Sequence, residues 1–288
     1  MFSSLSPLLA PFAFALGRAA RSDALADWSA RLDPLFARAH LYKIGRKGWA
    51  LEEARRFART PQLIAAMNSD CGELVRNSFS YSRSQLLQDL FVVLACGAKR
   101  GGYFVEIGVG NGEGLSNTYL LEKQYGWTGL LAEPNPEFHE SIAAKREAIL
   151  DRRAVFSQSG KTLDLLVDVN AGELSTLVDF DGRDSHVRRG GTVPVMTVTL
   201  DDLLAEHGAP VVIDYMSIDT EGSEYEVLKS LDLTKRKVMI FTIESNYDKA
   251  KMQKIDSVLL KLGYRVVLRS LSLFDTWYLH PDADNKFV

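Results

Sequence analysis

The sequence has few cysteines, no surplus charge of one sign and no long apolar run, and each absence excludes a class of protein. Its two cysteines, Cys71 and Cys96, are too few for a disulfide framework or a zinc site, which favours a reducing, cytoplasmic setting. A net charge of −3 gives no electrostatic reason to expect nucleic acid as a partner. The remaining composition, 46% hydrophobic and 25% charged, is that of an ordinary globular protein.

Residues 1–17 carry no charged side chain, but this run is too short to span a bilayer and contains Pro7 and Pro11. The first basic residue is Arg18, whereas a secretory signal begins with a basic region. We expect the segment to dock on the protein's own core or on a second subunit of a homo-oligomer. The alternative is peripheral contact of residues 1–20 with the inner face of a membrane.

Apolar spacing predicts a helical extension over residues 1–80 and an α/β domain over 81–288, in which strands and helices alternate. The expected strands are 103–107, 128–132, 153–157, 211–218, 237–243, 264–269 and 275–279. The expected helices are 84–95, 115–125, 137–148, 200–207, 223–231 and 248–262. Because a short segment joins the last two strands, they should pair antiparallel. The predicted fold is Rossmann-like: a mostly parallel seven-stranded sheet with one antiparallel strand, interrupted at 158–191 by an irregular insertion that could form a lid.

The most informative segment is the apolar run Tyr103–Ile107, which contains Glu106 and leads into glycines at every second position from 108 to 114. A strand, a glycine turn and then a helix are typical of α/β domains that bind nucleotide-like groups. A nicotinamide dinucleotide is the weaker interpretation, because its Gly-x-Gly-x-x-Gly pattern from Gly108 requires glycine where Glu113 stands. Tyr225 and Lys229 match the Tyr-x-x-x-Lys pair of reductases, but such pairs occur three times in this chain.

Acidic residues also end other predicted strands. In an open α/β sheet, ligands bind outside the carboxyl ends of the strands, where Glu133, Asp219 and Glu244 stand. The Glu133 carboxylate could accept hydrogen bonds from both hydroxyls of a ribose. The alternative is a surface acid before a Pro-Asn-Pro turn.

Six ordered motifs within residues 82–280 support a more specific interpretation. They are Ser84-Gln85-x-x-Gln88-Asp89, Phe104-Val-Glu106-Ile-Gly108, Ser116-Asn117-Thr118-x-x-Leu121-Glu122, Gly126-Trp127-x-Gly129-Leu-Leu-x-Glu133-Pro134-Asn135-Pro136, Val198-Thr-Leu-Asp201-Asp202-Leu and Ser217-Ile-Asp219-Thr-Glu221-Gly222-Ser-Glu224. In this order and spacing they resemble the FkbM family of S-adenosylmethionine-dependent methyltransferases. The resemblance implies the class I methyltransferase fold and methyl transfer from that cofactor.

The resemblance also implies where the cofactor lies. Its amino-acid part would lie near Glu106 and over the glycine turn, its ribose at Glu133, and its adenine beside the segment after the third strand. The residues assigned to the cofactor are Gln85, Asp89, Glu106, Gly108, Gly110, Asn111, Gly112, Ser116, Asn117, Glu133, Pro134, Asn135, Ser157, Gln158 and Asp219. For Gln88 and Asp89 the alternative is a helix cap and an acid in the first helical turn.

Hydroxyl groups are poor nucleophiles at neutral pH, so their methylation needs a general base or a metal ion. Asp219 is the first candidate base, followed by Glu221, with His186 in the insertion as a further candidate. Alternatively, Asp219, Glu244 and Asn246 offer oxygen ligands for Mg²⁺, although acids at strand ends also orient loops.

We therefore expect an O-methyltransferase acting on a hydroxyl of a sugar, glycan or glycosylated metabolite. The alternatives are a methyltransferase for a polyketide, a peptide or another small molecule, and a catalytically silent cofactor-binding protein of the same fold.

Overall fold

The computed structural model describes residues 60, 63, 72–182 and 186–283. The chain divides into two compact units, and every helix and strand described below lies in the second unit, Cys71–Phe287. The apolar segment 1–17 and most of the predicted helical extension lie outside the described residues. Helix α4 (Gly72–Phe79), which falls within the predicted extension, belongs to the second unit.

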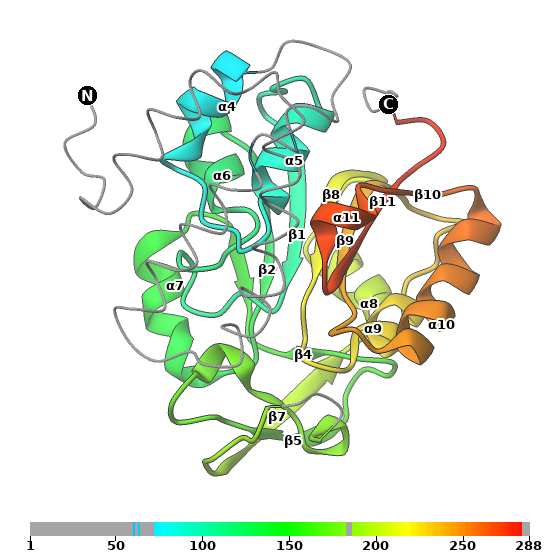
Figure 1. Cartoon of the computed structure of the whole chain (residues 1–288). Helices are drawn as coiled ribbons and strands as arrows, with labels where there is room; N and C mark the ends of the chain where they lie inside the picture. Colours follow the sequence, from blue (N-terminus) through cyan, green and yellow to red (C-terminus); the bar gives the residue numbers. More distant parts are fainter. Residues whose placement is uncertain (1–59, 61–62, 64–71, 183–185, 284–288) are drawn as a thin grey trace. The chain divides into compact units, whose positions relative to one another are not determined.

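A seven-stranded sheet forms the centre of this unit, in the order β10-β11-β9-β8-β1-β2-β3 (Figure 1). Its strands are β1 (Tyr103–Ile107), β2 (Thr128–Ala132), β3 (Ile149–Asp151), β8 (Val212–Ile218), β9 (Lys237–Glu244), β10 (Arg265–Val267) and β11 (Asp275–Leu279). Neighbouring strands are parallel except at β11, which is antiparallel to both β9 and β10. The structure thus confirms a mostly parallel sheet with one antiparallel strand.

Helices cover both faces of this sheet, as the continuously apolar strands predict. The helices after α4 are α5 (Gln88–Ala95), α6 (Tyr119–Tyr125), α7 (His139–Lys145), α8 (Leu200–Glu206), α9 (Glu224–Lys229), α10 (Lys249–Leu259) and α11 (Arg269–Ser272). On one face, strand residues such as Ile107 and Tyr278 share a core with apolar residues of α8, α9 and α10, which gather on one side of the sheet in Figure 1. Trp277 points to the other face and stacks on Phe91 of α5, with ring centroids 4.6 Å apart.

The third strand was predicted at 153–157, and this prediction is wrong. The third strand of the main sheet is β3, which ends at Asp151. The Asp151 carboxylate accepts hydrogen bonds from the backbone and guanidinium of Arg153 and contacts His207 at 2.9 Å, so the chain turns there. The next strand, β4 (Ala154–Val155), pairs with a different sheet.

The described part of residues 158–191 contains strands and 3-10 turns, whereas an irregular insertion was predicted. A second sheet in the order β4-β7-β5-β6 combines β4 with β5 (Thr162–Leu166), β6 (Thr176–Leu177) and β7 (Thr192–Val198). Short 3-10 turns η2 (Gly172–Leu174) and η3 (Val178–Phe180) flank β6. The second sheet has its own small apolar cluster, which includes Leu165, Phe180 and Val195. The second sheet escaped prediction because β6 has only two residues and many residues of β5 and β7 are exposed or half-buried.

None of the helices among the described residues has the length and apolar character of a membrane span.

The end of β1 approaches the end of β8 so closely that only glycine fits at position 108. Gly108 has φ +82°, and a Cβ atom there would lie 1.7 Å from the Asp219 carbonyl oxygen. Gly126 has a similar φ of +64° with nothing within 4 Å of its Cβ position, so it is a matched control.

We predict that Gly108→Ala destabilises the protein by at least about 2 kcal/mol more than Gly126→Ala. Both variants carry the left-handed backbone penalty of about 1–2 kcal/mol, but only the first adds a backbone clash. Urea unfolding of the two variants measures the difference. Equal losses would show that the strand ends can separate without cost.

Candidate functional site

The carboxyl ends of β2, β1, β8 and β9 meet at one edge of the main sheet and bring Glu133, Asp219 and Glu244 together with the glycine turn. The Gly108 N–H donates to the Ala132 carbonyl at 3.0 Å, and the Asp219 N–H donates to the Ile107 carbonyl at 2.9 Å. These backbone bonds continue the pairing of β1 with β2 and β8. Residues far apart in sequence therefore form one site, at the edge where α/β sheets bind ligands.

Glu106 is buried and fixes the segment that follows the glycine turn. Its carboxylate accepts hydrogen bonds from the Asn117 N–H at 2.6 Å and from the hydroxyls of Ser116 (3.0 Å) and Thr118 (2.5 Å). Burial raises the pKa of Glu106, while the Arg146 guanidinium and these hydrogen bonds oppose that shift. Three protein donors occupy the carboxylate, so Glu106 shapes the turn from beneath.

Arg146 is a site residue that the sequence did not reveal. Its buried guanidinium lies 3.6 Å from Glu106 and forms a 2.9 Å ion pair with Glu122. It also donates to the Gly112 carbonyl at 3.2 Å and to the Thr118 hydroxyl at 2.8 Å. An arginine at the end of a polar helix gives no signal in the sequence, because its partners come from three other segments.

Asn117 carries an unpaired acceptor. Its Nδ2 donates to the Ser217 hydroxyl at 2.8 Å, close to the end of β8. Its Oδ1 is the buried side-chain polar atom that has no hydrogen-bond partner among the described residues. An unsatisfied buried acceptor costs about 1–3 kcal/mol, so this oxygen favours a ligand that brings a donor.

Glu133 is not a surface acid, because only 6% of it is exposed. One carboxylate oxygen accepts from the N–H groups of Val109 and Gly110, both at 2.9 Å, and the other accepts from the Asn135 N–H at 2.9 Å. Burial raises the pKa of Glu133, and these backbone bonds oppose the shift. A carboxylate has about four acceptor positions, so about one remains for a ligand hydroxyl.

Other residues of the predicted cofactor set mainly bond within the protein. Asp89 accepts from the hydroxyls of Ser82 (2.6 Å) and Ser84 (2.5 Å) and from the Arg83 N–H. A bridge between Ser84 and Leu115 ties this segment, which includes the partly buried Gln85, to the glycine turn. Asp89 is therefore an acid in the first turn of α5 that bonds within the protein, which was the alternative given for it. Its contact with the cofactor stays a prediction.

The turn residues Asn111 and Pro134 complete the predicted set at the strand ends. The Asn111 carboxamide oxygen accepts from the N–H groups of Glu113 (3.0 Å) and Gly114 (2.8 Å), which closes the glycine turn. Pro134 is partly buried directly after Glu133.

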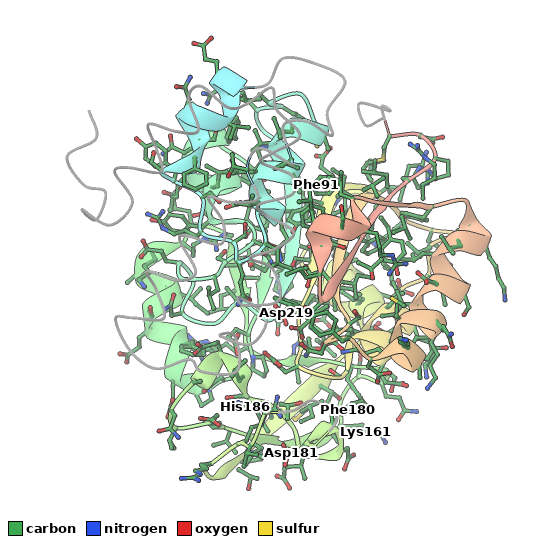
Figure 2. All side chains as sticks on the ribbon, in the orientation of Figure 1. Phe91, Lys161, Phe180, Asp181, His186 and Asp219 are labelled. Atoms are coloured by element: carbon green, nitrogen blue, oxygen red, sulfur yellow. The ribbon has the colours of Figure 1, made fainter. Side chains whose placement is uncertain are left out.

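Three predicted residues lie elsewhere. Ser157 and Gln158 follow β4 in the second sheet instead of the third strand of the main sheet, so the reason for placing them at the adenine is lost. His186 Nε2 lies 2.9 Å from the Asp168 carboxylate within the insertion. Figure 2 shows His186 apart from Asp219, so the structure does not bring these two candidate bases together.

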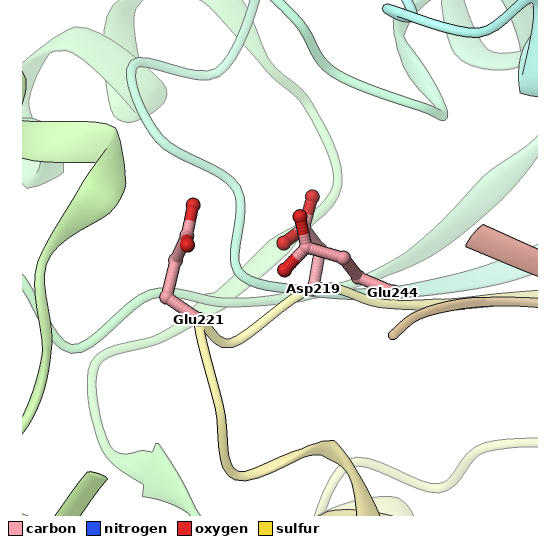
Figure 3. Close-up of side chains that lie close together, drawn as sticks. All are labelled: Asp219, Glu221 and Glu244. Atoms are coloured by element: carbon pink, nitrogen blue, oxygen red, sulfur yellow. The ribbon is translucent and has the colours of Figure 1, made fainter. Parts of the chain in front are cut away.

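Asp219, Glu221 and Glu244 form a carboxylate cluster (Figure 3) whose oxygens lie within 4.8 Å of one another. Asn246 donates through Nδ2 to Glu244 at 2.8 Å and, at 3.5 Å, to Glu221. Burial and the nearby charge of Asp219 raise the pKa of Glu244 well above its ordinary value. Such a cluster retains protons or attracts a cation.

Two cations lie beside the carboxylate cluster. Arg188, buried in the insertion, places its guanidinium 3.5 Å from Glu221. Lys251 forms a 2.5 Å ion pair with Glu224, which is also buried. The insertion therefore supplies part of the charge balance of the strand-end site.

Asp275 is a further buried acid that the sequence did not single out. It starts β11 directly opposite Glu244 and accepts a 2.8 Å hydrogen bond from Gln88 Nε2. Burial and the charge of Asp219 raise the pKa of Asp275 to about 7. Gln88 thus connects α5 to the strand beside the carboxylate cluster.

The strand order, the glycine turn after β1 and the acids at the ends of β2, β8 and β9 define a class I methyltransferase. Residues 96–266, more than half of the chain, match the family described as "Methyltransferase FkbM domain". The chain belongs to the FkbM family of methyltransferases. A comparison with curated proteins found no match.

Several solved structures show a distant likeness. The human methyltransferase 10 domain containing protein is 14% identical, with 76% of this chain and 95% of that chain covered and a TM-score of 0.36. The N-terminal domain of human METTL16 in complex with SAH is 14% identical, with 79% and 92% covered and a TM-score of 0.38. MtNAS in complex with MTA and tNA is 16% identical, with 89% and 96% covered and a TM-score of 0.36.

We predict that Asp275→Asn changes how stability depends on pH. The carboxyl has a pKa of about 7 in the folded protein and 3.8 ordinarily, so folding takes up a proton between these values. Wild-type stability therefore falls as pH rises from about 4 to about 7, by on the order of 4 kcal/mol from this group alone. Asp275→Asn lacks this loss, so its stability relative to wild type should rise across the window. Urea unfolding at several pH values tests this, with the exposed Asp282→Asn as control. Parallel curves for wild type and Asp275→Asn would refute it.

Proposed function

We propose that this protein transfers a methyl group from S-adenosylmethionine to a hydroxyl of a sugar, glycan or glycosylated metabolite. The observation that carries the proposal is the carboxylate cluster at the ends of β8 and β9, beside the glycine turn. The turn provides close approach for a nucleoside-like cofactor, and the cluster provides proton acceptors for a hydroxyl.

The residues at the strand ends fit the cofactor. The unpaired Asn117 Oδ1 suits a cationic donor such as the ammonium group of the methionine part. The remaining acceptor position of Glu133 suits a ribose hydroxyl, and Gly108 and Gly110 place no side chain at two positions of the turn. When bound, the cofactor supplies an electrophilic methyl group on a sulfonium.

Asp219 is our candidate base for the acceptor proton. It ends β8 next to β1 and is partly exposed, so an acceptor can reach it. The raised pKa of Glu244, caused by burial and by Asp219, holds that neighbour toward its protonated form. Arg188 and Asn246 position Glu221 beside Asp219 in the same cluster. Environments that separate the protonation of adjacent carboxyls are typical of acid–base sites.

A divalent cation is the second candidate for the same cluster. Three carboxylates with oxygens within 4.8 Å form a hard donor set of the kind Mg²⁺ prefers. The third ligand would be Glu221 instead of Asn246, because the Asn246 amide nitrogen donates to Glu244 and Glu221. Such an ion would lower the pKa of a bound hydroxyl.

Incubation with S-adenosylmethionine and a panel of glycosides, glycans and non-sugar hydroxyl compounds tests the function. We expect mass spectrometry to show the gain of one methyl on a sugar hydroxyl, with a rate that EDTA leaves unchanged. Loss of activity with EDTA and recovery with Mg²⁺ would show that the cluster binds a catalytic metal ion instead of supplying the base. Methylation of peptides or polyketides alone would refute the sugar assignment.

We predict that Asp219→Asn lowers kcat by about 10²–10⁴-fold, because the amide cannot accept the acceptor proton. Binding of S-adenosylhomocysteine, measured by calorimetry, should stay close to wild type. Asp282→Asn, at an exposed carboxylate paired with Lys237, is the matched control and should leave both quantities unchanged. Normal turnover by Asp219→Asn would remove Asp219 from the reaction. Cofactor binding without any turnover by the wild type would favour a silent binding protein.

A further inference from the structure

Tyr247 stands exposed beside the carboxylate cluster. It follows Asn246, which bonds to Glu244 and Glu221, and 60% of its surface is open to solvent. Its ring contacts the ring of Phe274 edge-on, with centroids 6.1 Å apart. An aromatic ring with this much exposure is a surface on which another molecule can pack.

The backbone holds Tyr247 in an unusual conformation. Asn246 and Tyr247 have φ values of +50° and +60°, a left-handed pair that costs roughly 1–2 kcal/mol per residue. The loop is anchored before the ring, where the Phe274 carbonyl accepts from the N–H groups of Ser245 (2.7 Å) and Asn246 (3.0 Å). It is anchored after the ring by Asp248, the N-cap of α10. Strain maintained from both sides points to a function for the presented side chain.

A groove opens next to this loop, between the insertion and the first turns of α9 and α10. Its lining includes Phe180, Glu221, Glu226, Asn246, Asp248 and Lys254. Glu221 belongs to the carboxylate cluster, and Asn246 and Asp248 are the two sequence neighbours of Tyr247. The groove therefore adjoins the carboxylate cluster and the two residues that flank Tyr247.

The charges in the groove indicate what kind of molecule it suits. Carboxylates and lysine ammonium groups both line it, so a strongly anionic or cationic ligand would meet repulsion from one of the two kinds of group. Hydroxyl groups avoid this conflict, because each can donate to a carboxylate and accept from an amine. The lining thus favours a neutral, polyhydroxylated ligand.

We propose that Tyr247 is the acceptor platform: the apolar face of a neutral sugar ring packs on it, and the groove binds the hydroxyls of the same acceptor. This inference rests on the proposed function for its chemical class. It adds the residue that selects a sugar ring over an open-chain hydroxyl compound. Tyr247 acts in binding, and Asp219 keeps the role of base.

The test uses the full-length protein, methyl hexopyranosides as probes and three variants. Tyr247→Ala removes the ring, Tyr247→Phe keeps it, and Val212→Ala alters an exposed apolar residue at the opposite end of β8. Tyr247→Ala should raise KM about five- to tenfold for a methyl hexopyranoside that the wild type accepts as substrate. Its kcat and its affinity for S-adenosylhomocysteine should stay near wild type. Tyr247→Phe and Val212→Ala should match wild type, and thermal unfolding checks that all three variants fold.

Saturation-transfer NMR on the same methyl hexopyranosides separates this proposal from the proposed function, because it measures binding without turnover. Signals of the sugar ring protons that appear with wild type and disappear with Tyr247→Ala support the platform even if no sugar is methylated. Sugar methylation with an unchanged KM in Tyr247→Ala overturns the platform alone. If wild type neither binds nor methylates any of these sugars, the carbohydrate class is wrong in both proposals.

Discussion

The contact between the Gly108 backbone and the Asp219 carbonyl is the constraint on which the site depends. No Cβ atom fits between them, because the end of β1 lies directly against the end of β8. The glycine turn and the first acid of the carboxylate cluster are neighbours for this reason, although Gly108 and Asp219 are 111 positions apart in the sequence. The hydrogen bonds that the N–H groups of Val109 and Gly110 donate to Glu133 then fix the other side of the turn. The turn is thus held between the ends of β8 and β2.

Buried charge is the second theme of this molecule. Removing carboxylates from water is expensive unless cations or hydrogen bonds replace the water. At Glu106 the Arg146 guanidinium and three hydrogen-bond donors replace water. Beside Asp219, Glu221 and Glu244, the guanidinium of Arg188 lies 3.5 Å from Glu221, and Lys251 pairs with Glu224. Glu106 thus supports the turn after β1, whereas the three acids of the carboxylate cluster face one another.

The sequence predicted those features that depend on local pattern. Apolar runs located β1, β2, β8, β9 and β11, and their final acids were correct candidates because parallel strands end at one edge. The prediction failed where contacts between distant segments determine the position of a strand or the role of a side chain. β3 was misplaced because Asp151 ends it through side-chain bonds, and the second sheet was missed because its strands are short and partly polar. Arg146 and Asp275 gain their meaning only from partners that folding brings to them.

The separate pairing of the second sheet has an evolutionary consequence. Among the described residues, its strands pair with one another and not with the seven-stranded sheet. It reaches the strand ends through side-chain bonds, such as the 2.8 Å bond from the Thr176 hydroxyl to the Glu221 carbonyl. Mutations, insertions or exchange of this module can therefore accumulate without shifting the register of the main sheet. A change of sequence in this second sheet can therefore alter the surroundings of Glu221 while the seven-stranded sheet and the glycine turn keep their structure.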